Sequence, residues 1–267
     1  MSNLTDSTYL RNIQYRDSSN LSARACLHER FSINKIGWHT WVFQQLELPH
    51  RSKILEVGCG PAYLWQKNLP TLSDGWRVFL SDLSQGMLEE ARDSLREISH
   101  FSYTSLDGSN LPFPEGFFDA VIANHVLYHL PALPLALSEI RRVLKPGCCL
   151  YAATNGEKHL HEIRQWKERF CPENDQAKRY TPTTRFSLEN GASQLQNFFH
   201  SVQLRCYPDQ LEINEVEPIL RYIESYLDYQ ELQQPLERLR LFLDKTLEKD
   251  GFLKVTKETG IFQAVKR

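Results

Sequence analysis

The segment from Ser52 to Trp65 constrains the fold of this chain more than any other. An apolar run over residues 53–57 leads into a turn with glycine at positions 58 and 60, and a short amphipathic segment follows. This order predicts a buried strand, a tight turn and the start of a helix. Gly58 and Gly60 carry no Cβ, so the backbone can bend sharply there and approach a ligand closely. The sequence therefore predicts a ligand-binding turn at the end of the first strand.

Two classes of ligand could use such a turn. A dinucleotide places its pyrophosphate on the helix N-terminus through the pattern Gly-x-Gly-x-x-Gly. The third glycine of that pattern falls on Tyr63 here, and the acid before the turn, Glu56, suits a cationic ligand better than a pyrophosphate. The residues therefore disfavour a dinucleotide, while a strand–turn–helix without any ligand stays open as an alternative.

Beyond this turn the chain alternates between strand and helix patterns. We expect strands over residues 53–57, 76–81, 101–106, 118–123 and 148–154, with apolar helical stripes between them. Such alternation predicts a parallel sheet with helices on both faces. Ligands bind these sheets at the carboxyl ends of the strands. The residues at those predicted ends are Glu56, Gly58, Asp82, Asp107, Asn124 and His125.

The turn resembles motif I of class I S-adenosylmethionine (SAM)-dependent methyltransferases, Glu/Asp-x-Gly-x-Gly-x-Gly, with Ala62 in place of the last glycine. Residues 117–129 and 139–147 resemble the fourth-strand region and the following segment of the same family. The resemblance covers about residues 50–155 and is closest to the branch that includes ubiquinone and menaquinone biosynthesis methyltransferases. It implies an α/β fold with a Rossmann-like seven-stranded sheet that ends in an antiparallel pair of strands, and a SAM-binding core over residues 51–155.

The same resemblance implies where SAM would bind. Asp82, at the second strand end, would accept hydrogen bonds from the ribose hydroxyls, and Asp107 would accept from the adenine amine. A helix N-cap for Asp82 and a turn role for Asp107 stay open as alternatives. The full set of expected cofactor-binding residues is Tyr15, Glu56, Gly58, Cys59, Gly60, Ala62, Asp82, Leu83, Met87, Leu106, Asp107, Gly108, Asn124 and His125.

The implied reaction is an in-line displacement at the methyl of a sulfonium, which leaves S-adenosylhomocysteine. The leaving group is a neutral thioether and needs no acid, so proximity and orientation, worth about 7–11 kcal/mol at best, carry most of the catalysis. A base is needed only where the acceptor must lose a proton. We expect His125 and Tyr128 to be catalytic and His129 to pack or cap. The acceptor atom and the use of a base stay open.

The segments that flank the core carry no motif that names a substrate. Residues 1–50 are expected to form a helical arm, either as packing or as a lid from which Tyr15, Arg24 or His28 reaches the site. Residues 156–267 are expected to hold the last two strands, near 201–207 and 260–265. A helical insertion at about 208–255 would cap the substrate side, with Tyr222, Tyr226 and Tyr229 facing the pocket or solvent.

Composition narrows the functional classes to which the chain can belong. A formal net charge of −2 gives no electrostatic case for nucleic acid or an anionic membrane, and no apolar run is long enough to span a bilayer. The six cysteines include no Cys-x-x-Cys pair, so we expect reduced thiols and no metal site. We therefore expect a cytoplasmic enzyme, monomeric or homodimeric, that methylates a small organic acceptor. A nicotinamide-dependent oxidoreductase and a cofactor-binding protein without catalysis are the alternatives.

Overall fold

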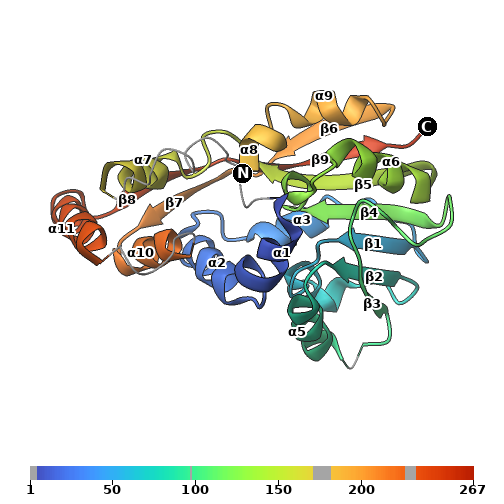
Figure 1. The fold of residues 1–267 in the computed structure, drawn as a ribbon, viewed down its shortest axis with the longest axis horizontal. Coiled ribbons are helices and arrows are strands. Elements are labelled where there is room, and N and C mark those ends of the chain that lie inside the picture. The colour runs from blue at the N-terminus through green and yellow to red at the C-terminus, as the bar shows by residue number, and fades with distance from the viewer. Residues whose placement is uncertain (1–4, 97, 171–181, 226–232) are drawn as a thin grey trace.

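A seven-stranded sheet forms the centre of the molecule. The computed structural model describes residues 5–96, 98–170, 182–225 and 233–267 (Figure 1). The strand order is β3-β2-β1-β4-β5-β9-β6; β1 to β5 are parallel, and β9 runs antiparallel to both of its neighbours. This confirms the predicted Rossmann-like sheet with its antiparallel final pair. The strands are β1 (Lys53–Val57), β2 (Arg77–Asp82), β3 (Phe101–Ser105), β4 (Phe118–Asn124), β5 (Leu144–Asn155), β6 (Ser201–Cys206) and β9 (Thr259–Val265).

Two apolar cores cover the two faces of this sheet. Successive side chains of a strand point to opposite faces, so Ile54 of β1 lies in one core and Leu55 in the other. The first core contains residues of α6 (Leu133–Val143) and α9 (Gly191–Gln196). The second contains residues of α3 (Trp38–Gln44), α4 (Tyr63–Gln66) and α5 (Gln85–Leu95). The helices on both faces leave the carboxyl ends of the parallel strands as the place for a site.

A third core lies beyond the sheet and joins the N-terminal arm to the C-terminal insertion. Helix α2 (Ser19–Phe31) contributes Leu27 and Phe31, which pack with residues of α10 (Glu217–Glu224), α11 (Gln233–Asp250) and α7 (His161–Phe170). Figure 1 shows α2 beside α10, on the side of the molecule away from β3. The arm and the insertion are therefore packed on one another.

The insertion is not entirely helical, and in this respect the sequence-based prediction is wrong. Strands β7 (Asp209–Ile213) and β8 (Leu253–Lys257) pair antiparallel in a separate two-stranded sheet. Their alternating apolar residues, Leu211, Ile213, Leu253 and Val255, are buried on one face of that sheet. Tyr226 and Tyr229 lie outside the described residues. No helix in the described ranges is long and apolar enough to cross a bilayer.

Short helical segments complete the chain. The arm begins with α1 (Ser7–Tyr9) and a π-helical turn, η2 (Leu10–Gln14), neither of which the apolar pattern predicts. The helix after the glycine turn begins at Tyr63. Strand β5 begins at Leu144, before the expected Cys148, because Leu144 pairs with Phe118 across an irregular register. The remaining segments are η3 (Leu69–Thr71), η4 (Leu127–His129) and α8 (Pro182–Arg185).

Candidate functional site

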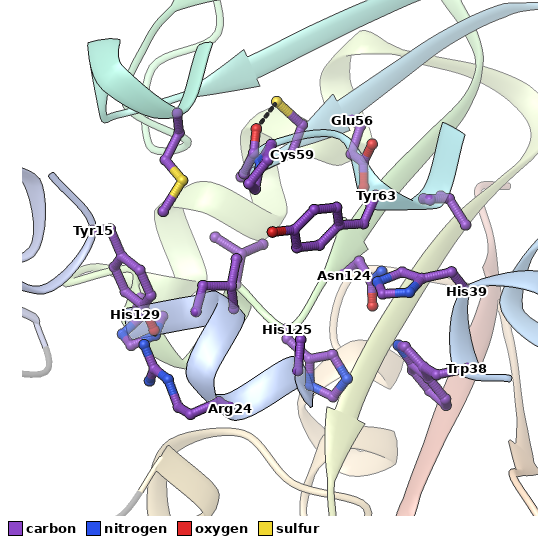
Figure 2. Close-up of a pocket in the computed structure, with 18 of the residues that line it drawn as sticks. Tyr15, Arg24, Trp38, His39, Glu56, Cys59, Tyr63, Asn124, His125 and His129 are labelled. Atoms are coloured by element: carbon purple, nitrogen blue, oxygen red, sulfur yellow. Dashed lines mark hydrogen bonds between the residues drawn. The ribbon is translucent and has the colours of Figure 1, made fainter. Parts of the chain in front are cut away.

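A cavity of about 670 Å³ lies at the carboxyl ends of β1, β4 and β5, between the sheet, α2 and the N-terminal arm. Figure 2 shows side chains from the N-terminal arm, α2 and the ends of β1 and β4 around it. The cavity is within the range of roughly 300–1,000 Å³ that is typical of small-molecule sites. Of the candidate residues from the sequence, all line it except Ala62, which is fully buried.

The glycine turn has the close backbone approach that its sequence predicts. Gly58 has a φ of 68°, and a Cβ at this position would lie 2.4 Å from Cγ2 of Val126. Gly60 also has a positive φ, and its N–H donates to Oδ2 of Asp82 over 2.9 Å. The N–H of Cys59 donates to the carbonyl of Ser81, which ties the turn to β2. Any side chain at position 58 would therefore displace the turn from the end of β4.

Ala62, at the position of the motif's last glycine, adopts the left-handed conformation with φ 65° and ψ 36°. An L-residue with a Cβ costs about 1–2 kcal/mol in this region relative to right-handed backbone. The alanine therefore adopts, at some strain, a backbone conformation that a glycine would adopt readily. Because Ala62 caps α4 from behind the turn, it supports the cavity wall without lining it.

Asp82 connects the glycine turn to the next helix. Its Oδ1 accepts from the N–H of Ser84 over 2.8 Å, and its Oδ2 accepts from Gly60. Ser84, not Asp82, is the N-cap of α5. Burial raises the pKa of Asp82, while the backbone N–H groups of Ser84, Gly60 and Leu83 oppose that shift. A carboxylate offers about four lone-pair sites, so Asp82 has acceptor capacity left for a ligand.

Glu56 is the buried acid of the site. Its side chain lies at the end of β1, and Nε1 of Trp65 donates to its Oε2 over 2.5 Å. Burial raises the pKa of Glu56 to about 8, with the Trp65 hydrogen bond opposing the shift and Asp82 adding to it. Burial also raises the pKa of the Cys59 thiol, with contributions from Asp82 and Glu56. At neutral pH the thiol is therefore protonated, and Glu56 is mostly neutral.

The end of β4 directs two further groups at the cavity. Oδ1 of Asn124 is buried and has no hydrogen-bond partner among the described residues. His125 has a left-handed φ of 57°, and its N–H donates to the carbonyl of Ala153. Its ring lies 5.2 Å from that of Trp38. At the end of β3, Oδ1 of Asp107 accepts from the N–H of Ser109, so its turn role is observed, and it also lines the cavity.

Four histidines surround the part of the cavity away from the glycine turn. Burial lowers the pKa of His28 and of His125 to about 3, with further lowering by Lys257. Burial also lowers the pKa of His39 to about 4 and that of His159 well below its usual value. The rings of His28 and His159 stack at 5.5 Å. This wall of the cavity is therefore made of neutral imidazoles at physiological pH.

The N-terminal arm closes one side of the cavity through specific contacts. The hydroxyl of Tyr15 lies 3.0 Å from Nε2 of His129, and the guanidinium of Arg24 lies over the Tyr15 ring at 5.3 Å. Figure 2 shows Tyr15 and His129 side by side. The N–H of Ser18 donates to Glu90 of α5 over 3.0 Å. His129 therefore connects the arm to the end of β4, beyond the packing role that the sequence predicts.

Several lining residues have no signal in the sequence motifs. His159 follows β5 at its carboxyl end, so the strand-end rule could have found it. Lys257 ends β8, a strand that the sequence-based prediction lacks. None of the described residues of α10 and α11 lines the cavity. Tyr222 packs beside the third core, which does not support the expectation that tyrosines of the insertion line the pocket.

Comparison with known proteins gives the family of this domain. A family model described as "Methyltransferase domain" matches residues 55–152. The chain is 33% identical over 121 residues to the malonyl-acyl-carrier-protein O-methyltransferase of Legionella pneumophila and 33% identical over 125 residues to the demethylmenaquinone methyltransferase of Symbiobacterium thermophilum. These matches cover 45% and 43% of this chain and 42% and 49% of the relatives, so the chain spans less than half the length of the curated relatives it matches.

The whole chain also resembles solved structures. The cyclase SpnF matches with a TM-score of 0.61 at 17% identity, covering 97% of this chain and 96% of the other. At this identity the likeness shows the fold, and a fold of this kind supports more than one chemistry. The motifs, the sheet order and the match over residues 55–152 agree. Residues 55–152 of this chain match a methyltransferase domain, and the fold around them is similar to that of solved methyltransferases.

Proposed function

We propose that this protein transfers a methyl group from SAM to a small organic acceptor. The observation that carries the proposal is one continuous cavity that extends from the glycine turn to the histidine-lined ends of β4 and β5. Its size is that of a small-molecule site, and its ends differ in chemistry, with acids near the turn and neutral rings beyond it. The names of the two relatives, an acyl-carrier-protein O-methyltransferase and a quinone-pathway methyltransferase, support a methyl acceptor that is not nucleic acid.

Asp82, Glu56 and Asn124 fit the polar groups of SAM. Asp82 has acceptor capacity for ribose hydroxyls, and Leu83 and Met87 line the adjacent wall. Glu56 and Oδ1 of Asn124 are buried acceptors near the turn, and they suit the ammonium of the amino-acid moiety. A buried acceptor without a partner costs about 1–3 kcal/mol, so a ligand donor at Asn124 recovers that energy.

The expected mechanism depends on positioning rather than on acid–base chemistry. When bound, SAM supplies an electrophilic methyl on a sulfonium, with a neutral thioether as the leaving group. His125 and Tyr128 lie at the end of β4, where they can hold an acceptor by hydrogen bonds and contact. With a pKa of about 3, His125 is a weak base, so it serves as a neutral hydrogen-bonding group. The arm, held by Tyr15 and His129, excludes water from the site.

We also infer the setting in which the protein works. The cysteines at 26, 59, 148, 149 and 206 are all free thiols, which suits a reducing compartment such as the cytoplasm. The net charge of −2 gives no electrostatic case for binding to nucleic acid. We infer a monomer or homodimer that acts on a small molecule without nucleic acid or a membrane.

An acceptor screen tests this function. The purified protein is incubated with SAM and a library of small phenols, carboxylic acids, amines and thiols, and formation of S-adenosylhomocysteine is measured for each. Turnover with at least one class, lost in Gly58→Val, supports the proposal because the valine side chain would displace the turn. Binding of S-adenosylhomocysteine without turnover of any acceptor would favour a cofactor-binding protein without catalysis. Hydride transfer from a nicotinamide cofactor would favour an oxidoreductase.

A further inference from the structure

Lys257 is a charged residue of the cavity wall that the proposed mechanism does not use. It is the last residue of β8 and lies two positions before Thr259, which pairs with Asn155 at the carboxyl end of β5. It lines the cavity, and its charge lowers the pKa of four of the lining histidines, His28, His39, His125 and His159. Lys257 therefore belongs to the acceptor end of the cavity.

A buried network fixes the position of this ammonium. Nζ of Lys257 lies 2.6 Å from Oδ2 of Asp209 and 3.5 Å from the hydroxyl of Ser32. Asp209 also accepts from the Ser32 hydroxyl and, over 3.0 Å, from the N–H of Asn34. The side chains of Lys257 and Asp209 are 4% and 0% exposed. Lys257 lines the cavity and Asp209 does not, so the lysine is the member of this ion pair that a ligand in the cavity can approach.

The other groups that line this end of the cavity also favour a methyl acceptor that binds through an electron-rich oxygen. The acids Glu56, Asp82 and Asp107 lie at the ends of β1, β2 and β3, by the cofactor turn. Glu29 lies on the wall but forms an ion pair with Lys67 over 3.0 Å. Nε1 of Trp38 is a buried donor without a hydrogen-bond partner among the described residues, and indole can only donate. A cationic acceptor would lie against the Lys257 ammonium and would leave the Trp38 N–H without an acceptor.

We propose that Lys257 binds an anionic oxygen of the methyl acceptor, so that the acceptors are carboxylates, phenolates or enolates rather than amines. This inference rests on the proposed methyltransferase function and names its substrate class. The acceptor enters as its conjugate base, and an electron pair of its oxygen, or of the carbon conjugated to it, forms the bond to the methyl carbon. The carbon–sulfur electron pair returns to sulfur, so an anion and a sulfonium give two neutral products. No proton is transferred, which agrees with the weak basicity of His28, His39, His125 and His159.

Three small probes of similar size and different charge test this assignment. Benzoate, benzamide and benzylamine are titrated into the complex of the protein with S-adenosylhomocysteine, and binding is followed by ligand-observed NMR. We expect the Kd of benzoate to be at least about tenfold lower than the Kd of either other probe. A tenfold ratio of Kd corresponds to a modest difference in binding free energy, which one ammonium facing a carboxylate can supply. Equal binding of the three probes, a preference for benzylamine, or no detectable benzoate binding would overturn the assignment.

Variants identify Lys257 as the residue responsible. Lys257→Met alone leaves Asp209 buried and unpaired, so the informative variant is Lys257→Met combined with Asp209→Asn, which removes both charges. This double variant should lose the preference for benzoate and still bind S-adenosylhomocysteine. Lys257→Arg should keep the preference, and so should Lys35→Met, which removes another lysine of the same cavity wall.

The outcomes separate this inference from the function on which it rests. Retention of the benzoate preference by a folded double variant, or its loss in Lys35→Met, would contradict the assignment to Lys257 while leaving the methyltransferase proposal intact. If the double variant does not fold, the assignment is tested by the affinities of the three probes for the unmodified protein and for Lys257→Arg. Failure of the unmodified protein to bind S-adenosylhomocysteine would instead refute the proposed function.

Discussion

The substitution Gly86→Ala distinguishes closure of the N-terminal arm from the stability of the sheet domain. We expect it to weaken the closed arm and to leave the domain equally stable or slightly more stable. Gly86 is the second residue of α5, and a Cβ there would lie 2.1 Å from the carbonyl oxygen of Arg16. In a helix not touched by the arm, Gly→Ala stabilises by about 0.5–1 kcal/mol. Against the closed arm, the added carbon must push Arg16 away.

The magnitude follows from the contacts that this displacement breaks. The hydrogen bonds from Ser18 N–H to Glu90 and between Tyr15 and His129, each 3.0 Å long, hold this part of the arm. At about 0.5–1.5 kcal/mol each, their loss removes about 1–3 kcal/mol from the closed state. If cofactor binding requires closure, the Kd for S-adenosylhomocysteine rises by roughly five- to 150-fold. The free energy of unfolding of the sheet stays the same or increases slightly.

Three measurements check this reasoning: calorimetric Kd for S-adenosylhomocysteine, urea unfolding, and the rate of tryptic cleavage at Arg11 and Arg16. We expect weaker binding and faster cleavage without a loss of global stability. Gln85→Ala, one residue earlier in the same helix and exposed, is the matched control and should change none of the three appreciably. Unchanged affinity and unchanged cleavage in Gly86→Ala would refute a closed arm that supports cofactor binding.

Two further predictions concern protons. Because the pKa of Glu56 is about 8, cofactor binding at pH 7 should ionise Glu56 and release close to one proton. Calorimetry in buffers of different ionisation enthalpy measures this release. The same release of protons in Glu56→Gln, or on binding of methylthioadenosine, which lacks the amino-acid moiety, would contradict this role. Because His28 and His125 have pKa values of about 3 in the folded protein and near 6.5 unfolded, the unfolded chain binds more protons below pH 6.5, so stability should fall as pH falls from 6.5 towards 3. Protonation of each of these two histidines should lower the free energy of unfolding by up to about 2 kcal/mol by pH 5. His28→Gln should make the free energy of unfolding depend less on pH, whereas replacement of the exposed His200 should leave its pH dependence unchanged.

The core of the fold is predictable because its signals are local. The apolar run of β1, the glycine turn and the strand–helix alternation each depend on residues close in sequence, and each specifies a buried parallel strand or its connection. The rule that ligands bind at carboxyl ends of strands then brings Glu56, Asp82, Asn124 and His125 together without any knowledge of the tertiary structure. These residues do line one cavity.

The acceptor end was not predictable because its contacts are non-local. Lys257 reaches the cavity only because β8 pairs with β7 across the whole insertion, and its ion pair with Asp209 joins residues far apart in the chain. The sequence predicts the pairing of β7 with β8 only weakly, because many exposed segments that form no strand show the same short alternation of apolar and polar residues. Likewise, the contact between Tyr15 and His129 depends on how the arm returns over the sheet, which periodicity does not specify.

The central claim, that the glycine turn binds SAM, is tested most directly by titrating S-adenosylhomocysteine and NAD into the unmodified protein and into Asp82→Ala by calorimetry. The account predicts that S-adenosylhomocysteine binds and NAD does not. It also predicts that Asp82→Ala weakens binding by about 1–3 kcal/mol, because a buried acceptor for the ligand hydroxyls is lost. Binding of NAD without binding of S-adenosylhomocysteine, or an affinity for S-adenosylhomocysteine that does not depend on Asp82, would contradict the claim.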